Sequence, residues 1–257
     1  MYSGFNVDLR GITIPEFYLV RGRALYEANQ ETVRAKISSF INPRGKIDAG
    51  QLQAEWFPSV EADVFISHSH NDLDQALIFS GWLLDQGITT FVDSCVWGNA
   101  SQLLKEIDKI YTWQPTRGVY DYNLRNFSTS HVHMLLSVAL TKIIDTCECL
   151  FFLNTPNAIR SEEVVAETAS PWLYHELTIA SFIRRKELSD YRSYADFQKG
   201  LSVNEGLEMA FPVNLEDLIE LDANDIVAWE EKLTGMEPYP LDTLYKYVSK
   251  RRKLKTL

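Results

Sequence analysis

Residues 62–72 read Ala-Asp-Val-Phe-Ile-Ser-His-Ser-His-Asn-Asp, a short apolar run that favours a strand and then a polar loop. Apolar residues at helical spacing follow over residues 73–84, and Gly87 provides a stop for that helix. The next run, residues 88–92, reads Ile-Thr-Thr-Phe-Val and predicts a second strand. A strand, a helix and a strand of these lengths form a parallel pair joined by a right-handed crossover.

The alternation of strands and helices continues toward the C-terminus. Residues 148–154 are strongly apolar and predict a third strand, and residues 207–213 predict another. Further expected elements are a short strand over 11–15 and helices over 21–41, 131–146, 172–186, 214–231 and 241–252. This order predicts an α/β fold with a central, mostly parallel sheet and helices on both faces.

Two of the predicted helices begin with suitable capping residues. Asn71 or Asp72 would be the N-cap of the helix after the first strand. Ser170 would cap the helix that starts near Trp172, with Pro171 at its first position.

The sequence divides into three parts. We interpret residues 1–60, which carry no strong motif, as an N-terminal extension. Residues 61–213 hold the α/β domain, and residues 214–257 form a C-terminal helical region. Inside the domain, residues 108–130 are rich in Tyr, Asn, Arg, Pro and Gly without clear periodicity, so we interpret them as an insertion or long loop.

Composition excludes several classes of protein. The chain has 257 residues, of which 46% are hydrophobic and 23% charged, as in globular proteins and unlike disordered or collagen-like chains. No apolar run approaches the roughly 20 residues that span a bilayer, so we expect no membrane partner. A net charge of −10 argues against nucleic acid as a partner. The basic residues 246–255 are interpreted as a solvated helix end rather than a nucleic-acid or membrane site.

Cysteine and histidine spacing indicates neither a disulfide framework nor a metal site. An odd count of three cysteines and a charged N-terminus predict reduced thiols and a cytoplasmic location. His131 and His133 are two residues apart on a predicted helix and so point to different faces. Cys147 and Cys149 have no matching second pair nearby, so we expect no bound metal.

The candidate site lies where the predicted strands end. Ligands of parallel α/β folds bind at the carboxyl ends of the strands. Ser67, His68 and Ser69 follow the first strand, and residues 93–97 follow the second. The helix that carries Glu176 follows the third strand.

Glu176 is the most unusual residue of this set. Its neighbours three and four positions away on the helix are Trp172, Leu173, Ile179 and Ala180, all apolar. A carboxylate on such a face indicates a buried pair or a pocket, and the alternative is a glutamate at the helix edge with access to solvent.

These segments together resemble a known family. Residues 63–72, 87–93 and 97–99 look like the opening of a Toll/interleukin-1 receptor (TIR) domain through its BB loop, and residues 149–154 look like its third strand. Trp172-Leu-Tyr-His-Glu176 matches the W-x-x-x-E pattern of the family's NAD-cleaving members.

The resemblance covers roughly residues 62–213 and implies a flavodoxin-like TIR fold that takes NAD+ as substrate and needs no cofactor. The catalytic glutamate of the family maps onto Glu176. Nicotinamide is cationic in NAD+ and leaves as a neutral molecule, so no general acid is required. One carboxylate near the ribose would stabilise the positive charge that develops there.

The resemblance also implies that NAD+ is bound by Ser67, His68, Ser69, Asp93, Trp97 and Trp172. The first three would approach the ribose and the diphosphate, aided by backbone donors at the start of the following helix. Asp93 and Trp97 would line the same cleft from the BB-loop side. Trp172 would either shape the pocket or fix the helix.

Such an enzyme makes ADP-ribose when water attacks the ribose, or a cyclic ADP-ribose isomer when an atom of the same molecule attacks. By resemblance, the chain would signal in bacterial anti-phage immunity, as in a Thoeris-like defence system. No second module is recognisable, so we expect the effector in another chain and activity that depends on a homo-oligomer or an activator.

Two other functions stay open at this point. The chain could be a non-enzymatic TIR scaffold that acts by self-association through the BB loop. It could also be a glutamate-dependent nucleoside or nucleotide glycosyl-transfer enzyme on a similar sheet.

Overall fold

The computed structural model has a five-stranded central sheet in the order β3-β2-β6-β1-β9. Its strands are β1 (Ser3–Val7), β2 (Val64–Ser67), β3 (Thr90–Val92), β6 (Cys149–Leu153) and β9 (Ile219–Leu221). The structure describes residues 1–30, 47–57, 60–159, 167–168, 170–183, 185–191, 211–212, 215–233 and 239–255.

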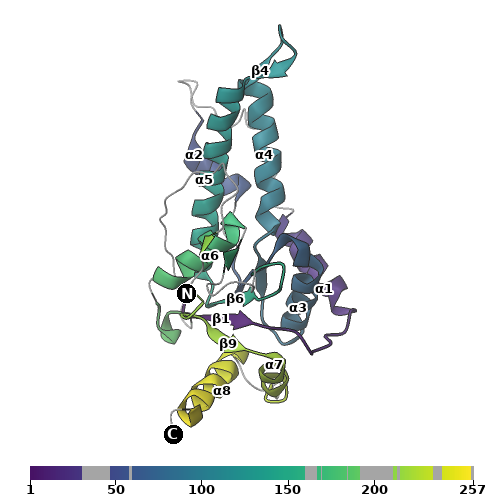
Figure 1. Cartoon of the computed structure of the whole chain (residues 1–257), viewed down its shortest axis with the longest axis vertical. Helices are drawn as coiled ribbons and strands as arrows, with labels where there is room; N and C mark the ends of the chain where they lie inside the picture. Colours follow the sequence, from purple (N-terminus) through teal and green to yellow (C-terminus); the bar gives the residue numbers. More distant parts are fainter. Residues whose placement is uncertain are drawn as a thin grey trace.

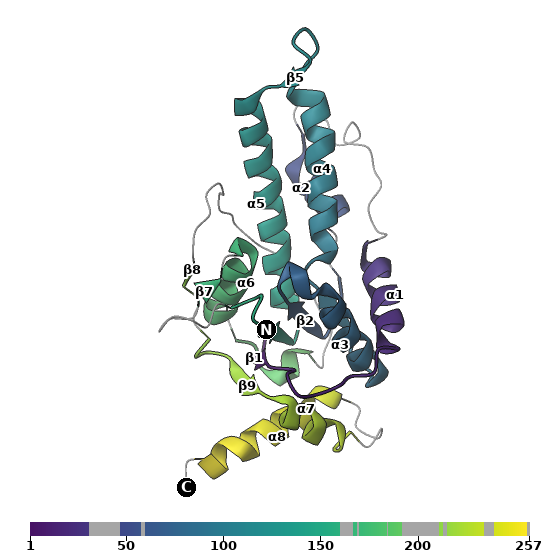
Figure 2. The same cartoon turned by 45° about the vertical axis from the view of Figure 1, so that its right-hand side comes forward.

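All four strand pairings of this sheet are parallel. β2 has β3 on one side and β6 on the other, so the chain changes direction across the sheet between β2 and β6. The flavodoxin-like order 2-1-3-4-5 has its ligand site at the same switch point, and here β1 occupies the place of the fourth strand and β9 that of the fifth. The predicted α/β, flavodoxin-like fold with a parallel central sheet is therefore confirmed (Figures 1 and 2).

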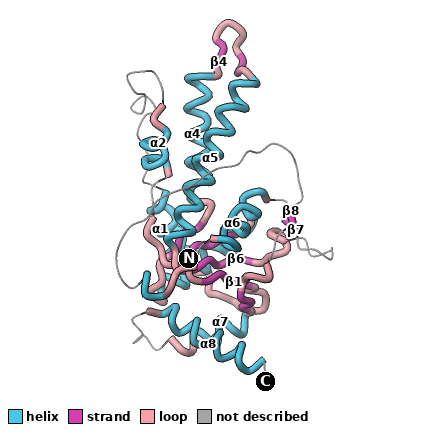
Figure 3. The backbone as a smooth tube through the Cα atoms, turned by 90° about the vertical axis from the view of Figure 1, so that its left-hand side faces the viewer, coloured by secondary structure: helices cyan, strands magenta, loops and turns pink. Residues whose placement is uncertain are grey.

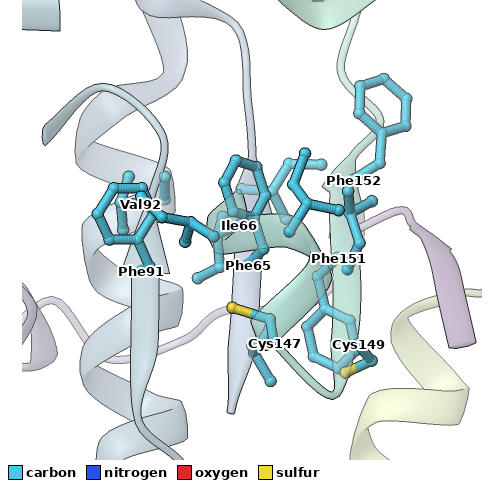
Figure 4. Close-up of a cluster of buried hydrophobic side chains, with 14 of the residues drawn as sticks. Phe65, Ile66, Phe91, Val92, Cys147, Cys149, Phe151 and Phe152 are labelled. Carbon is cyan, nitrogen blue, oxygen red and sulfur yellow. The ribbon is translucent and has the colours of Figure 1, made fainter. Parts of the chain in front are cut away.

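β6 lies at the centre of the sheet, and all five of its side chains are buried. A continuous apolar run is what a strand covered on both faces requires. Figure 4 shows Phe65 of β2 between Phe91 of β3 and Phe151 of β6, and the rings of Phe65 and Phe91 lie 5.7 Å apart between centroids. The three strands predicted from apolar runs are thus confirmed to within two residues at each end.

Helices cover both faces of the sheet. α1 and α3 pack together on one side, and α6 packs against α5 on the other (Figures 1 and 3). The helices are α1 (Tyr18–Gln30), α2 (Ala49–Trp56), α3 (Leu73–Asp85), α4 (Cys95–Tyr111), α5 (Tyr122–Thr146), α6 (Pro171–Phe182), α7 (Ala223–Glu230) and α8 (Pro240–Lys255). Across the described residues, none of these helices combines the length and apolar character needed to cross a membrane.

The N-terminal segment belongs to the sheet and is not a separate extension. β1 pairs with β6 on one side and with β9 on the other. The sheet therefore draws strands from both sides of the predicted 61–213 domain, since β9 lies beyond residue 213. Local patterns did not reveal this because both partners of β1 are distant in the sequence.

Two smaller expectations for this segment are revised. The strand predicted at residues 11–15 is wrong, because the chain forms a turn and a loop there. The helix predicted over 21–41 is observed as α1 up to residue 30, and residues 31–41 lie outside the described residues.

Residues 95–146 form a long helical hairpin, which we call the arm. α4 runs away from the sheet, α5 runs back, and the short strands β4 (Trp113–Gln114) and β5 (Val119–Tyr120) pair antiparallel at its end (Figures 1 to 3). The loop expected at 108–130 is wrong, because this segment is regular. Residues 122–127 of α5 are all exposed, so they lack the apolar periodicity that would predict a helix.

The C-terminal region contains a strand in addition to helices. β9 lies where a helix over 214–231 was expected, and only its second half is helical, as α7. The strand predicted at 207–213 is observed as β8 (Phe211–Pro212), which pairs with β7 (Glu167–Thr168) outside the central sheet. Residues 201–210 lie outside the described residues.

The predicted helix ends near the site are confirmed. Ser170 is the N-cap of α6, and its Oγ accepts a hydrogen bond from the Leu173 backbone N–H at 3.3 Å, with Pro171 in the first turn. Gly87 follows α3 with φ of +79°, a conformation that glycine adopts without steric cost.

Two glycines set the close packing of α1 on α3. A Cβ atom placed on Gly81 would lie 2.1 Å from the Tyr18 carbonyl oxygen, and one on Gly22 would lie 1.8 Å from the Leu77 carbonyl oxygen. The backbones of the two helices therefore touch, which larger side chains prevent.

We predict that Gly81→Ala destabilises the chain by about 1–3 kcal/mol, because the new methyl group separates the helices. This expected change in stability is opposite in sign to the effect of helix propensity, which favours alanine over glycine by about 1 kcal/mol. Urea unfolding measures the difference. Gly50→Ala in α2 is the matched control, because its added Cβ would meet no atom closer than 3.4 Å. A Gly81→Ala variant as stable as the control contradicts the prediction.

Candidate functional site

Four of the expected site residues meet at the carboxyl ends of β2 and β3. Ser67 ends β2, His68 follows it, and Asp93 follows β3. Glu176 reaches the same place from α6. All four side chains have no exposed surface, so the cluster is closed to solvent in this structure.

Glu176 is anchored by a serine from the sheet. The Ser67 hydroxyl donates a hydrogen bond to Glu176 Oε2 at 2.5 Å. Glu176 Oε1 has no hydrogen-bond donor among the described residues. The neighbours Leu173 and Ala180 are fully buried, which confirms that this carboxyl group rises from a packing face of its helix.

The environment of Glu176 favours its protonated form. Burial raises the pKa of this carboxyl group well above its usual value of 4.5, and the nearby Asp93 carboxylate raises the pKa further. The Ser67 hydrogen bond acts in the opposite direction and is the smaller effect. Two carboxyl groups that close cannot both ionise in a buried site without a large cost in free energy.

Asp93 is the centre of a second group of contacts. Its Oδ1 accepts a hydrogen bond from the Ser94 backbone N–H at 2.6 Å and lies 2.5 Å from His68 Nδ1. Its Oδ2 accepts from the His68 backbone N–H at 3.4 Å. The other ring nitrogen, His68 Nε2, lies 3.4 Å from Ser94 Oγ. Asp93 thus joins the loop after β2 to the loop after β3.

The other expected site residues lie at the margin of this cluster. Ser69 is nearly buried, and its carbonyl accepts a hydrogen bond from the Asp72 backbone N–H at 2.8 Å. Trp97 lies in the first turns of α4, and its side chain is outside the part of the structure that is described. Trp172 is half-buried one turn before Glu176, and its ring packs edge-on against His133 of α5 with centroids 5.6 Å apart.

Sequence reasoning missed a polar link across the switch point. Asp72 Oδ2 accepts a hydrogen bond from the Thr155 hydroxyl at 2.5 Å, and its Oδ1 accepts from the Asn157 side-chain amide at 2.7 Å. We call these three residues the clasp, because they join the loop after β2 to the loop after β6. Asp72 precedes α3 as expected, but its side chain makes no capping hydrogen bond. Its position at a strand end was the signal that could have identified it.

A histidine that the sequence analysis did not select fixes α6 on α5. His175 lies next to Glu176, and its Nε2 is 3.1 Å from Ser137 Oγ and 3.3 Å from Thr141 Oγ1. Burial lowers the pKa of both His175 and His133, so both rings favour the neutral form. These contacts help to hold the helix that carries Glu176.

No group of three or more His, Cys, Asp or Glu side chains suited to a metal ion occurs among the residues that the structure describes. Comparison of the chain with protein-family models, with curated proteins and with solved structures finds no match. The resemblance to TIR domains therefore stays a prediction from sequence motifs.

The arrangement suits chemistry that uses a carboxyl group in a dry site. Glu176 can hold a proton with Asp93 nearby, or it can ionise when a cation comes close. Ser67 supplies a hydroxyl donor, and His68 supplies an imidazole beside Asp93. A single carboxylate facing a developing positive charge is strongest where water is excluded.

We predict that Glu176→Gln stabilises the chain relative to wild type as the pH rises. The raised pKa means that the folded chain keeps a proton that the unfolded chain releases above about pH 4.5. The stability that Glu176 contributes is therefore complete below that pH and is lost as the pH rises through the folded pKa. The difference between variant and wild type should grow by up to roughly 1.4 kcal/mol per pH unit in this window.

Urea unfolding of both proteins at a series of pH values measures this difference. Glu231→Gln is the control, because Glu231 is exposed at the end of α7 and should leave the pH dependence unchanged. Parallel curves for Glu176→Gln and wild type would contradict the assigned burial and pKa of Glu176.

Proposed function

We propose that the chain is an NAD+-cleaving enzyme in which Glu176 stabilises the ribosyl cation as nicotinamide leaves. The observation that carries this proposal is a fully buried glutamate, held by Ser67 at the carboxyl edge of a parallel sheet. That edge, at the switch point between β2 and β6, is where flavodoxin-like folds bind nucleotide ligands. The W-x-x-x-E pattern that ends in Glu176 supports the same assignment.

A carboxyl group that is protonated in the free chain is compatible with this role. The nicotinamide ring of NAD+ carries a positive charge, and a cation close to Glu176 lowers the pKa of its carboxyl group. Substrate binding would thus generate the carboxylate in the site where it acts. The charge then faces the ribose carbon on which positive charge develops.

The surrounding residues have separate tasks in this proposal. Ser67 orients the Glu176 carboxylate through its hydroxyl donor. Asp93 holds His68 and the loop after β3 in place, and Ser69 lies in the loop that leads into α3. Backbone donors at the start of α3 would face the diphosphate.

The closed cluster implies a step that admits the substrate. Glu176 has no exposed surface, so the loops at the strand ends must separate before NAD+ can reach it. We infer that a homo-oligomer or an activator stabilises the open form, and that the effector of the product lies in another chain. Three buried free thiols and NAD+ as substrate suit a cytoplasmic location, and the TIR resemblance favours bacterial anti-phage signalling.

Wild-type chain incubated with NAD+ should release nicotinamide, and Glu176→Gln should lower the rate by at least about a hundredfold, as loss of a transition-state electrostatic contact does. Chromatography quantifies nicotinamide and distinguishes ADP-ribose from a cyclic isomer. The reaction is followed over a range of protein concentrations, so that activation by assembly is detected.

Glu187→Gln serves as the matched control, because it removes the same charge from an exposed position beside the N-terminus of β1, at the opposite edge of the sheet from the cluster. Equal nicotinamide release by wild type and Glu176→Gln would exclude Glu176 as the catalytic group. Wild-type chain that leaves NAD+ intact at every concentration would contradict the proposed activity.

A second candidate function is favoured by the proximity of Glu176 and Asp93. Cleavage of a neutral nucleoside requires an acid to protonate the leaving base, in addition to a carboxylate near the ribose. A raised pKa suits Glu176 to the role of acid, with Asp93 as the second carboxyl group of the site. The chain would then transfer or hydrolyse the glycosyl group of a nucleoside or nucleotide.

Incubation with a panel of nucleosides and nucleotides separates the two functions. The second candidate predicts release of free base from a nucleoside, no nicotinamide from NAD+, and a rate that falls at high pH as Glu176 loses its proton. The NAD+ proposal predicts nicotinamide release from NAD+ and no release of free base from a nucleoside.

A further inference from the structure

The end of the arm carries eight of the fifteen large apolar side chains that are exposed among the described residues. We call residues 109–127 the tip; it includes the end of α4, the strands β4 and β5, and the first turns of α5. Large apolar side chains exposed on the tip are Ile110, Tyr111, Trp113, Val119, Tyr120, Tyr122, Leu124 and Phe127. The other seven are spread over the rest of the described chain, whereas these eight lie within residues 110–127, and the Trp113 and Tyr120 rings pack together with centroids 4.9 Å apart. A contiguous exposed apolar patch indicates an interaction site.

The first turns of α5 are not buried by any other part of the chain that the structure describes. Residues 122–127 are all exposed, and the first buried residue of the helix is Ser128. Helices in proteins are stabilised mainly by packing of one face rather than by propensity. Tyr122 is 77% exposed and Phe127 is 66% exposed, so the packing surface of these turns has no cover within the described chain.

The charges of the arm select the kind of partner. Between residues 101 and 134, every exposed charged side chain is basic: Lys105, Lys109, Arg117 and Arg125. The acids of the same segment, Glu106, Asp108 and Asp121, are half-buried or buried. Arg125 pairs with the buried Asp108 at 2.9 Å, and Lys109 pairs with Glu106 at 2.9 Å. The tip therefore presents aromatic rings bordered by cations, on a chain whose net charge is −10.

A surface of opposite character lies at the other end of the molecule. Over β9 and α7 the exposed charged residues are acidic apart from Lys232: Glu216, Asp217, Glu220, Asp222, Glu230 and Glu231. Val227 is exposed among them and offers apolar contact. Arg251 of α8 pairs with Asp225, which is itself buried. Figures 1 and 2 show the tip and α7 at opposite ends of the long axis.

We propose that the tip of one chain docks on the β9–α7 surface of a second copy of this chain. A contact between two different surfaces either propagates head to tail or, when two copies lie antiparallel, is made twice and closes as a two-fold dimer. Pairing of tip with tip is disfavoured, because it brings the exposed bases of both copies together. This inference does not depend on the proposed enzymatic activity.

Sedimentation velocity of the full chain tests the proposal. Wild type should self-associate with rising concentration, and association should weaken as added salt screens the charges. Trp113→Ser and Phe127→Ser should each weaken self-association by about tenfold or more, as loss of a central aromatic anchor does. Val20→Ser is the matched control, because Val20 is an exposed apolar residue of α1, 73% exposed and outside both surfaces. It should associate like wild type.

A charge swap shows whether the partner is a second copy. Arg117→Glu and Glu231→Arg should each weaken association, and the double variant should restore it, because the contact is rebuilt with the signs exchanged. All positions are exposed, and circular dichroism checks that each variant is folded. Failure of the double variant to recover would overturn the proposed pairing of surfaces.

Two other results would also overturn it. The first is a wild-type chain that stays monomeric at every concentration in low salt. The second is binding of monomeric wild type to phosphatidylserine vesicles that is lost in Trp113→Ser, which would assign the tip to a lipid surface instead.

Discussion

The parallel pairing of β6 with β2 on one side and β1 on the other is the constraint on which the structure depends. It places the carboxyl ends of these strands at one edge and puts Ser67 beside Phe152. The loops after β2, β3 and β6 therefore lie together, so Asp93 contacts His68, and Thr155 and Asn157 contact Asp72. β6 is apolar at all five positions and buried on both faces, so its burial stabilises the centre of the sheet, where both neighbours pair with it.

The buried carboxyl groups of the site destabilise the fold. A buried carboxyl group beside a second one costs free energy unless one of them holds a proton. Ser67, His68 and Ser94 offset part of that cost through hydrogen bonds, but Glu176 Oε1 has no donor among the described residues. Conflicts of this kind between local stability and local chemistry are concentrated where proteins function. This conflict at Glu176 is the physical observation on which our proposed function rests.

Local sequence patterns were sufficient to predict the strands and the site residue that are completely buried. β2 and β6 were predicted because each is an apolar run, and β3 because residues 88–92 are β-branched or aromatic. Glu176 was selected because its helical neighbours are apolar. β1 was missed because Ser3–Val7 includes Gly4 and Asn6, and its pairing partners lie more than a hundred residues away. β9 was missed because Ile219–Leu221 is short and lies among acids that suggested a solvated helix. The clasp required knowledge of which strand ends become neighbours, and no single segment contains that information.

The arm shows why an absence of periodicity does not mean an absence of structure. At its base, α5 buries Val132, Leu136, Leu140 and Ile143 and has the apolar spacing of a packed helix. Its first two turns bury nothing, so the same helix has no pattern there. Apolar periodicity appears in a helix only where one face packs against the rest of its own chain. A face that contacts a second molecule would instead carry exposed aromatic side chains. The tyrosines and Phe127 in residues 111–127, which looked like the composition of a loop, are explained physically as the surface of a helix and hairpin that the other described residues do not bury.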